Sequence, residues 1–75
     1  MASQRELVLY IRRAHELYHQ VERTGREEVE YARVLSRAVR MATTNPGYLE
    51  GGHLTHNLGR RQRTWFTRLI EQEKT

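Results

Sequence analysis

Apolar residues recur every three or four positions through the first part of the chain, which is the spacing of one face of an α-helix. Ser3 followed by Glu6 matches the S-x-x-E capping box that begins many helices. Thr24 and Gly25 end the periodic run, and we expect Gly25 in the left-handed conformation that often follows a helix. The pattern therefore predicts a first helix over residues 3–24. Its apolar stripe consists of Leu7, Tyr10, Ile11, Ala14, Leu17, Tyr18 and Val21.

A second periodic run follows directly and predicts a helix over residues 26–43. Glu27 and Glu28 lie in its first turn, where negative charge interacts favourably with the helix dipole. Pro46 stops the helix, because proline lacks a backbone donor and disfavours helix at the preceding residue. The link to the first helix is short, so we expect the two helices to form an antiparallel hairpin. The apolar stripe of this second helix consists of Tyr31, Val34, Leu35, Ala38, Met41 and Ala42.

The third helical region is predicted over residues 53–72, after a loop that contains two adjacent glycines. No strand pattern is present in the sequence. We therefore predict an all-α fold and a single domain over residues 1–75, in which a helical hairpin is packed against a third helix to form a three-helix bundle. The predicted core consists of Leu7, Ile11, Leu17, Val34, Leu35, Ala38, Leu58, Trp65 and Leu69.

The C-terminal segment 54–70 allows two interpretations. Residues 54–59 resemble the first helix and the turn of a helix-turn-helix, and residues 61–69 would then be the recognition helix. In that case residues 61–63 would face the major groove, where arginine and glutamine read base edges. Alternatively, the segment is one continuous helix that tolerates Gly59 at a cost of about 1 kcal/mol. The uninterrupted apolar arc of the segment favours the single helix, and the helix-turn-helix is the alternative.

The composition narrows the class of protein. The 75 residues carry thirteen basic and nine acidic side chains, a net charge of +4, and every basic residue except Lys74 is arginine. There is no cysteine, which excludes disulfides and thiolate metal sites. Residues 51–75 hold five basic and two acidic side chains, so the net charge of this last third is +3. The positive charge is therefore concentrated toward the C-terminal end.

The arginines predict an anionic partner, because the planar guanidinium group matches phosphate and carboxylate geometry. We expect one basic surface built from the second and third helices. The favoured function is a small non-catalytic DNA-binding regulatory protein that contacts phosphates. The alternative is a protein-binding inhibitor or adaptor, of the kind found in phages and plasmids, that docks on an acidic partner or on a nucleic-acid-handling complex. RNA fits the same description. The predicted contact residues are Arg33, Arg37, Arg40, Arg60, Arg61, Arg63 and Arg68.

The histidines raise the question of a metal. Residues 15–19 match H-E-x-x-H, the zinc metalloprotease helix in which two histidines bind zinc and the glutamate is the general base. The motif lacks the third histidine of the metzincins, and no strand is available to line a peptide cleft. A weaker alternative joins two histidine pairs in one structural zinc site, although such sites mostly use cysteine. We predict no metal, no cofactor and no enzymatic activity. The histidines of that alternative are His15, His19, His53 and His56.

Two adjacent aliphatic residues, Val8 and Leu9, fall outside the apolar stripe of the first helix. A chain of this size has a thin core, so exposed aliphatic residues favour self-association, and we predict a homodimer. No apolar run approaches the roughly 18 residues that span a bilayer, and the N-terminus does not have the pattern of a signal peptide. We therefore expect no membrane partner and a cytoplasmic location.

Overall fold

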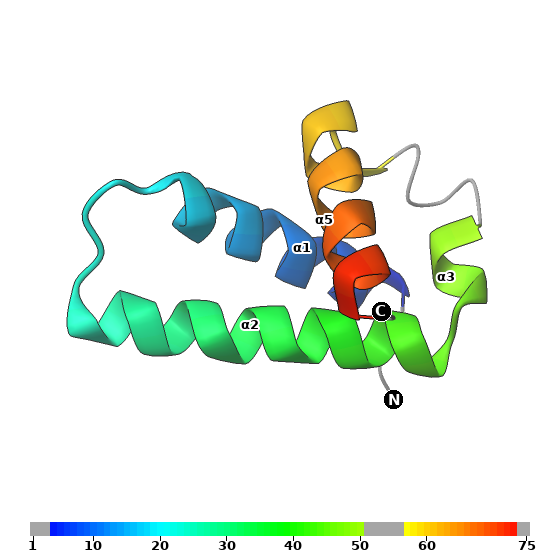
Figure 1. The fold of residues 1–75 in the computed structure, drawn as a ribbon, viewed down its shortest axis with the longest axis horizontal. Coiled ribbons are helices and arrows are strands. Elements are labelled where there is room, and N and C mark those ends of the chain that lie inside the picture. Colours follow the sequence, from blue (N-terminus) through cyan, green and yellow to red (C-terminus); the bar gives the residue numbers. More distant parts are fainter. Residues whose placement is uncertain (1–3, 51–56, 74–75) are drawn as a thin grey trace.

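The computed structural model describes residues 4–50 and 57–73, and these residues form helices and their connections without any β-strand. Helices α1 and α2 lie antiparallel as a hairpin, and α5 crosses α1 with its C-terminal end close to α2 (Figure 1). The all-α helical bundle predicted from the sequence is confirmed. Among the described helices, none is long and apolar enough to cross a membrane. The helices are α1 Gln4–His19, α2 Gly25–Thr44, the single turn α3 Gly47–Glu50, and α5 Arg60–Glu73.

The first helix is shorter than the sequence pattern indicates, because α1 ends at His19 and an extended link precedes α2. Gly25 does not adopt a positive φ and is the first residue of α2 rather than the end of α1. Thr24 caps α2 instead. Its side-chain oxygen accepts from the Glu27 amide at 3.1 Å, and the Glu27 carboxylate accepts from the Thr24 amide at 3.0 Å. Thr24 and Glu27 thus form a reciprocal T-x-x-E capping box, and α2 begins directly after Thr24. The capping box predicted at Ser3 lies outside the described residues.

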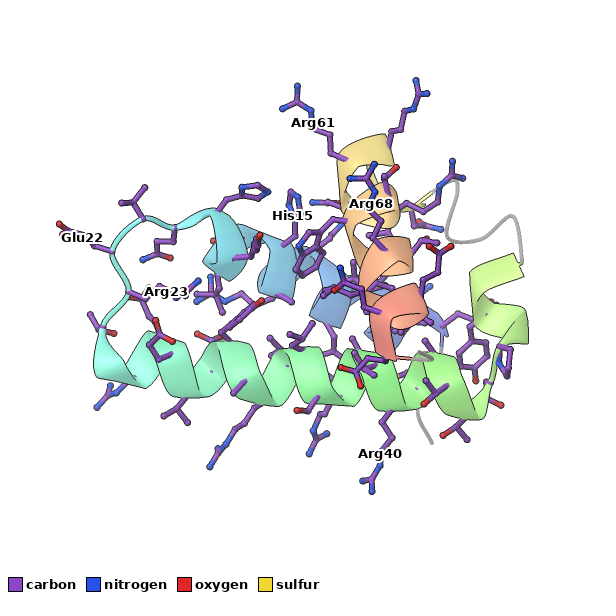
Figure 2. The ribbon with its side chains drawn as sticks, viewed as in Figure 1. His15, Glu22, Arg23, Arg40, Arg61 and Arg68 are labelled. Carbon is purple, nitrogen blue, oxygen red and sulfur yellow. The ribbon has the colours of Figure 1, made fainter. Side chains whose placement is uncertain are left out.

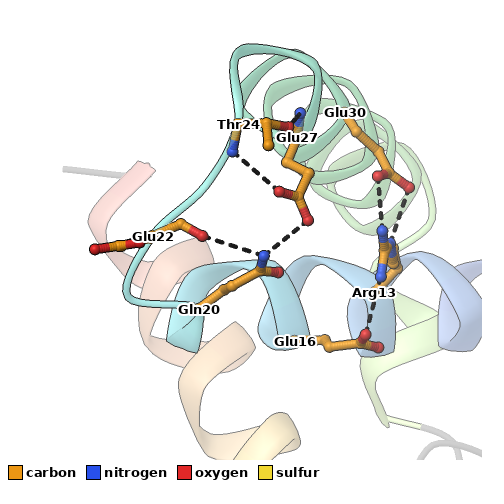
Figure 3. Close-up of polar contacts among 7 residues, drawn as sticks. All are labelled: Arg13, Glu16, Gln20, Glu22, Thr24, Glu27 and Glu30. Carbon is orange, nitrogen blue, oxygen red and sulfur yellow. Dashed lines mark hydrogen bonds and ion pairs between the residues drawn. The ribbon is translucent and has the colours of Figure 1, made fainter.

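Polar contacts hold the hairpin together near its loop (Figure 3). The Arg13 guanidinium donates two hydrogen bonds of 2.8 Å to Glu30 on α2 and one of 2.9 Å to Glu16. The Gln20 amide nitrogen donates to the Glu27 carboxylate at 2.8 Å, which joins the end of α1 to the start of α2. We call this set of contacts, together with those of Arg23, the loop-end network. Arg23 donates to the Leu17 carbonyl and to the Glu28 carboxylate, both at 2.8 Å, and so satisfies a carbonyl at the C-terminus of α1.

The apolar core lies at the other end of the hairpin, where α5 packs on it. Of the predicted core residues, five are buried, whereas Val34, Leu35, Trp65 and Leu69 are only half-buried at its edge. The buried cluster consists of Leu7, Val8, Ile11, Ala38, Ala42, Leu58, Phe66 and Ile70.

Val8 was expected on the surface and is instead buried, with 5% of its area exposed. It belongs to the same cluster as Leu58 and Phe66, because α5 and the chain before it cover a side of α1 that the hairpin alone would leave open. Leu9 is exposed at 56%. Val8 is therefore not available for contact with a second chain. The homodimer stays a prediction that depends on Leu9.

The segment 54–70 is not one continuous helix, because the helical backbone is interrupted at Leu58 and Gly59 and α5 begins at Arg60. The Gly59 carbonyl accepts from the Arg63 amide at 3.0 Å, and its amide donates to the Gln62 side chain at 3.2 Å. These two bonds close the first turn of α5 around the glycine. Residues 51–56, which include most of the first helix of the suggested helix-turn-helix, lie outside the described residues.

Candidate anion-binding groove between α1 and α5

A groove of about 540 Å³ lies where the C-terminal half of α1 meets the outward face of α5. We call it the α1–α5 groove. Within the described part of the chain, neither aspartate nor glutamate lines it, while three arginines and two histidines do. The charged side chains that line the groove are therefore all positive. It is formed by His15, Tyr18, His19, Arg60, Arg61, Thr64, Trp65, Arg68, Leu69 and Gln72.

Helix geometry brings the basic side chains of α5 together on the groove side. Arg61, Trp65 and Arg68 are separated by four and then three residues, which places them on one face of a helix. Arg61 and Arg68 project from α5 at successive levels, and His15 rises from α1 beside them (Figure 2). Arg60, Arg61 and Arg68 are exposed and form no ion pair with any residue in 4–50 or 57–73. Their donors are available to a ligand.

The α1 wall of the groove is aromatic. The rings of His15 and Tyr18 each lie 5.3 Å from the Trp65 ring, at interplanar angles of 73° and 66°. These are edge-to-face arrangements, which the quadrupoles of aromatic rings favour. His15 and His19 also meet, with ring centroids 4.3 Å and Nε2 atoms 3.0 Å apart, so one neutral ring can donate to the other. Four rings thus form a continuous surface beside the arginines.

The pKa of His15 responds to the positive charge around the groove. Partial burial lowers the pKa of His15, and the nearby charges of His19 and Arg61 lower it further. Burial disfavours the imidazolium form because it removes water from the charged ring, and the two neighbouring groups disfavour it by electrostatic repulsion. A bound anion would act in the opposite direction and favour protonation. The groove is therefore arranged to gain from negative charge.

The H-E-x-x-H motif does not assemble a hydrolytic centre among the described residues. Its glutamate, Glu16, is ion-paired with Arg13 at 2.9 Å and is not among the residues that line the groove beside the two histidines. Within residues 4–50 and 57–73, no group of three or more potential metal ligands is present. His53 and His56, needed for the four-histidine alternative, lie outside the described residues. The prediction of a metal-free protein stays a prediction.

The arginines of α2 do not line the groove, and the expectation of one basic surface over α2 and α5 stays a prediction. Arg33, Arg37 and Arg40 are exposed, and none of them lines the groove. Arg40 points away from α2 on the side opposite to Arg61 (Figure 2). The reason is that α2 turns its apolar stripe toward α1 and α5, so its arginines face outward from the other side. Arg63 is half-buried and already has an interaction partner.

Sequence reasoning placed the groove's arginines on the third helix but missed its aromatic wall. It assigned Trp65 to the core, and it considered His15 and His19 only as candidate zinc ligands. The available signal was the spacing of His15, Tyr18 and His19 on one stripe, together with a tryptophan set between two arginines. Nothing in the sequence indicates that these two stripes face each other. No family model, curated protein or solved structure matches this chain. Its function is therefore argued from the groove itself.

Proposed function

We propose that this chain is a small non-catalytic nucleic-acid-binding module that contacts phosphates through the α1–α5 groove. The observation that carries the proposal is the set of three exposed arginines, without ion pairs among the described residues, beside a groove that no described carboxylate lines. Guanidinium groups bind phosphate oxygens through paired hydrogen bonds, and a groove with apolar walls strengthens the field of such charges. The contacts assigned to the groove are those of Arg60, Arg61 and Arg68.

The regulatory role expected from the sequence follows the same chemistry. A small basic domain that covers phosphates can compete with larger proteins for the same nucleic acid, and it needs no catalytic group to do so. The arginines on the outer face of α2, namely Arg33, Arg37 and Arg40, then contribute a long-range attraction that speeds association. In this proposal they add little to the contacts at the groove.

The test is a comparison of two triple variants in a salt series. One variant replaces Arg60, Arg61 and Arg68 by glutamine, and the matched control replaces the three α2 arginines, so that both lose the same charge. Binding to fluorescent nucleic acid is measured by anisotropy. Each phosphate neutralised contributes about −0.9 to the log–log salt slope on duplex DNA and about −0.7 on single strands. We expect the groove variant to lose two or more units of slope and most of its affinity, and the control to lose little.

Two results would contradict the proposal. Equal losses in the two variants would mean that binding follows net charge and not the groove. Absence of binding to both duplex and single-stranded nucleic acid at low salt would exclude a nucleic-acid function. The exposed arginines would then be assigned to the acidic protein partner of the alternative adaptor function.

A further inference from the structure

We infer that the ligand of the α1–α5 groove is a single-stranded polynucleotide, whose bases stack on the aromatic wall while its phosphates contact the arginines of α5. This inference depends on the proposed nucleic-acid function and adds the class of substrate. It rests on the juxtaposition, within one groove, of aromatic rings from α1 and α5 and guanidinium groups from α5.

The aromatic wall offers faces on which a base can stack. Tyr18 is 46% exposed, and Trp65 is half-buried and lines the same groove. The ring pairs of this wall have interplanar angles between 66° and 73°, so none of them is a parallel stack. A nucleobase would stack on the ring surface that the edge-to-face contacts leave exposed, such as that of Tyr18. Stacking on such rings is how many proteins hold unpaired bases.

The arrangement along α5 suits a strand that follows the helix. Arg61 and Arg68 are seven residues apart, which corresponds to about 10 Å along a helix axis. Trp65 lies between them on the same face. A strand running beside α5 can place a phosphate near each arginine and a base against the ring between them.

The same groove is a poor fit to duplex DNA. Bases in a duplex are paired and stacked on one another, so they cannot reach aromatic rings set within a groove of about 540 Å³. The side chains that a recognition helix would use are also engaged. Gln62 accepts from the Gly59 amide, and Arg63 is half-buried with a partner of its own. Of the three residues expected to read the major groove of DNA, only Arg61 lines the α1–α5 groove of the protein.

The chain carries its own reporter, because Trp65 is its only tryptophan. We would titrate the protein with oligothymidylate, with oligouridylate, with a duplex of the same length, and with an abasic strand that has the phosphates but no bases. We expect both base-bearing single strands to quench Trp65 fluorescence and to bind about tenfold or more tightly than the abasic strand. The oligothymidylate and oligouridylate arms decide between single-stranded DNA and RNA.

Two variants of Tyr18 separate stacking from phosphate contact. Tyr18→Ala should weaken binding of the base-bearing strands about five- to tenfold and leave the abasic strand unchanged, whereas Tyr18→Phe, which keeps the ring, should bind normally. Leu9→Ala, on an exposed position of α1 away from the groove, is the matched control. Circular dichroism checks that each variant folds. If Tyr18→Ala does not fold, Trp65→Leu, which removes the aromatic ring, tests the same stacking surface with a labelled strand as readout.

The outcomes distinguish this inference from the function on which it depends. Equal affinity for abasic and base-bearing strands overturns stacking and leaves a phosphate-binding module. Duplex bound as tightly as the single strand, without quenching of Trp65, overturns the single-strand preference in the same way. Absence of binding to all four probes overturns both proposals. Quenching by single strands that requires the Tyr18 ring supports both.

Discussion

The loop-end network and the α1–α5 groove use arginine in opposite ways. At the loop end, Arg13 of α1 forms ion pairs with Glu16 at 2.9 Å and with Glu30 of α2 at 2.8 Å. Arg23 forms an ion pair with Glu28 of α2 at 2.8 Å and a hydrogen bond to the Leu17 carbonyl of α1. Each arginine therefore connects α1 with α2. Arg61 and Arg68 form no ion pair among the described residues and line the groove together with the aromatic rings. A count of arginines therefore overstates the binding surface, since part of the positive charge is already neutralised in holding the hairpin together.

The two ends of the hairpin also contribute differently to the stability of the fold. The loop end contains ion pairs at least partly open to solvent, which contribute little to stability because water competes for them. The opposite end contains Phe66, Ile11 and Leu7, all almost completely buried. Apolar burial contributes about 25 cal/mol per Å², so this end supplies most of the driving force for folding. The groove depends on that end, because the same helix α5 carries both its arginines and the buried Phe66.

The largest effect should come from releasing α5 from the hairpin. Phe66→Ala removes a ring that is only 1% exposed, and such truncations cost about 3–5 kcal/mol through lost burial and the remaining cavity. Chemical denaturation should show this loss, and the groove should lose its ligand at temperatures where the natural chain still binds. Val29→Ala is the control, because Val29 is 54% exposed and should change stability by less than about 0.5 kcal/mol. A loss at Phe66 as small as that at Val29 would contradict the described core.

A smaller effect, at the other end, should separate folding from binding. Arg23→Ala removes the bond to the Leu17 carbonyl, the ion pair with Glu28 and the contact of the guanidinium with the Tyr31 ring at 5.0 Å. We expect a lower melting temperature and an affinity for single strands within twofold of the natural chain. Arg26→Ala, at an exposed arginine in the first turn of α2, removes the same charge as a control. A loss of affinity specific to Arg23→Ala would contradict the division between the two regions.

Acid should act on the two regions in different pH windows. The pKa of His15 is lowered in the fold, so the unfolded chain binds its proton first, and stability present above about pH 6.5 is lost as the pH falls below that value. The positive groups around this ring are His19 on α1 and Arg60, Arg61 and Arg68 on α5. The pKa values of Glu27 and Glu30 are also lowered, by hydrogen bonds from Thr24 and Arg13, so their contribution is lost only as the pH falls below about 4.5.

Melting curves across this pH range test the assignment. His15→Gln should remove the upper step and keep the lower one, and Glu30→Gln should reduce the lower step and keep the upper one. A saturating single strand should weaken the upper step, because bound phosphate favours the protonated His15. A single acid transition, unchanged by both substitutions, would show that these groups do not control it.

The smallest expected effect is at the start of α5. Gly59 precedes the first residue of the helix, its φ is not positive, and a Cβ placed there would meet nothing closer than the Gln62 side chain at 3.7 Å. Gly59→Ser should therefore be tolerated and should raise stability by a few tenths of a kcal/mol, since serine caps a helix better than glycine does. Denaturation measures the gain, and Gly59→Ala, which has no capping oxygen, is its control. A destabilised serine variant would show that the backbone here requires glycine.

The helices themselves were predictable from the sequence, and α2 was predicted to within a residue at each end because its apolar stripe, its acidic first turn and Pro46 all agree. The end of α1 was not, because Val21 continues the periodic pattern although it is 98% exposed. In that region the capping box at Thr24 marks the start of α2. It is a local hydrogen-bonded structure that hydrophobic periodicity does not detect. Similarly, the uninterrupted apolar spacing of residues 54–70 favoured one continuous helix and did not detect the break at Leu58 and Gly59.

The groove was predictable only in part. The spacing of Arg61 and Arg68 shows that they share a face of α5, but that face becomes a site only because α5 crosses α1 beside His15 and Tyr18. This contact joins residues more than forty positions apart. Helical periodicity describes one helix at a time and contains no information on crossing. For the same reason the sequence could not show that the arginines of α5, and not those of α2, line the groove.

The two sides of α5 have different roles, and this difference affects how the sequence can evolve. Phe66 and Ile70 fasten the helix to the hairpin, while Arg61 and Arg68 lie on the exposed side. Replacement of the exposed residues leaves the buried contacts of Phe66 and Ile70 intact. We therefore expect variation on that side to change ligand binding without changing the fold. A library randomised at the exposed positions of α5, with Phe66 and Ile70 held constant, would therefore sample new ligands on an unchanged scaffold.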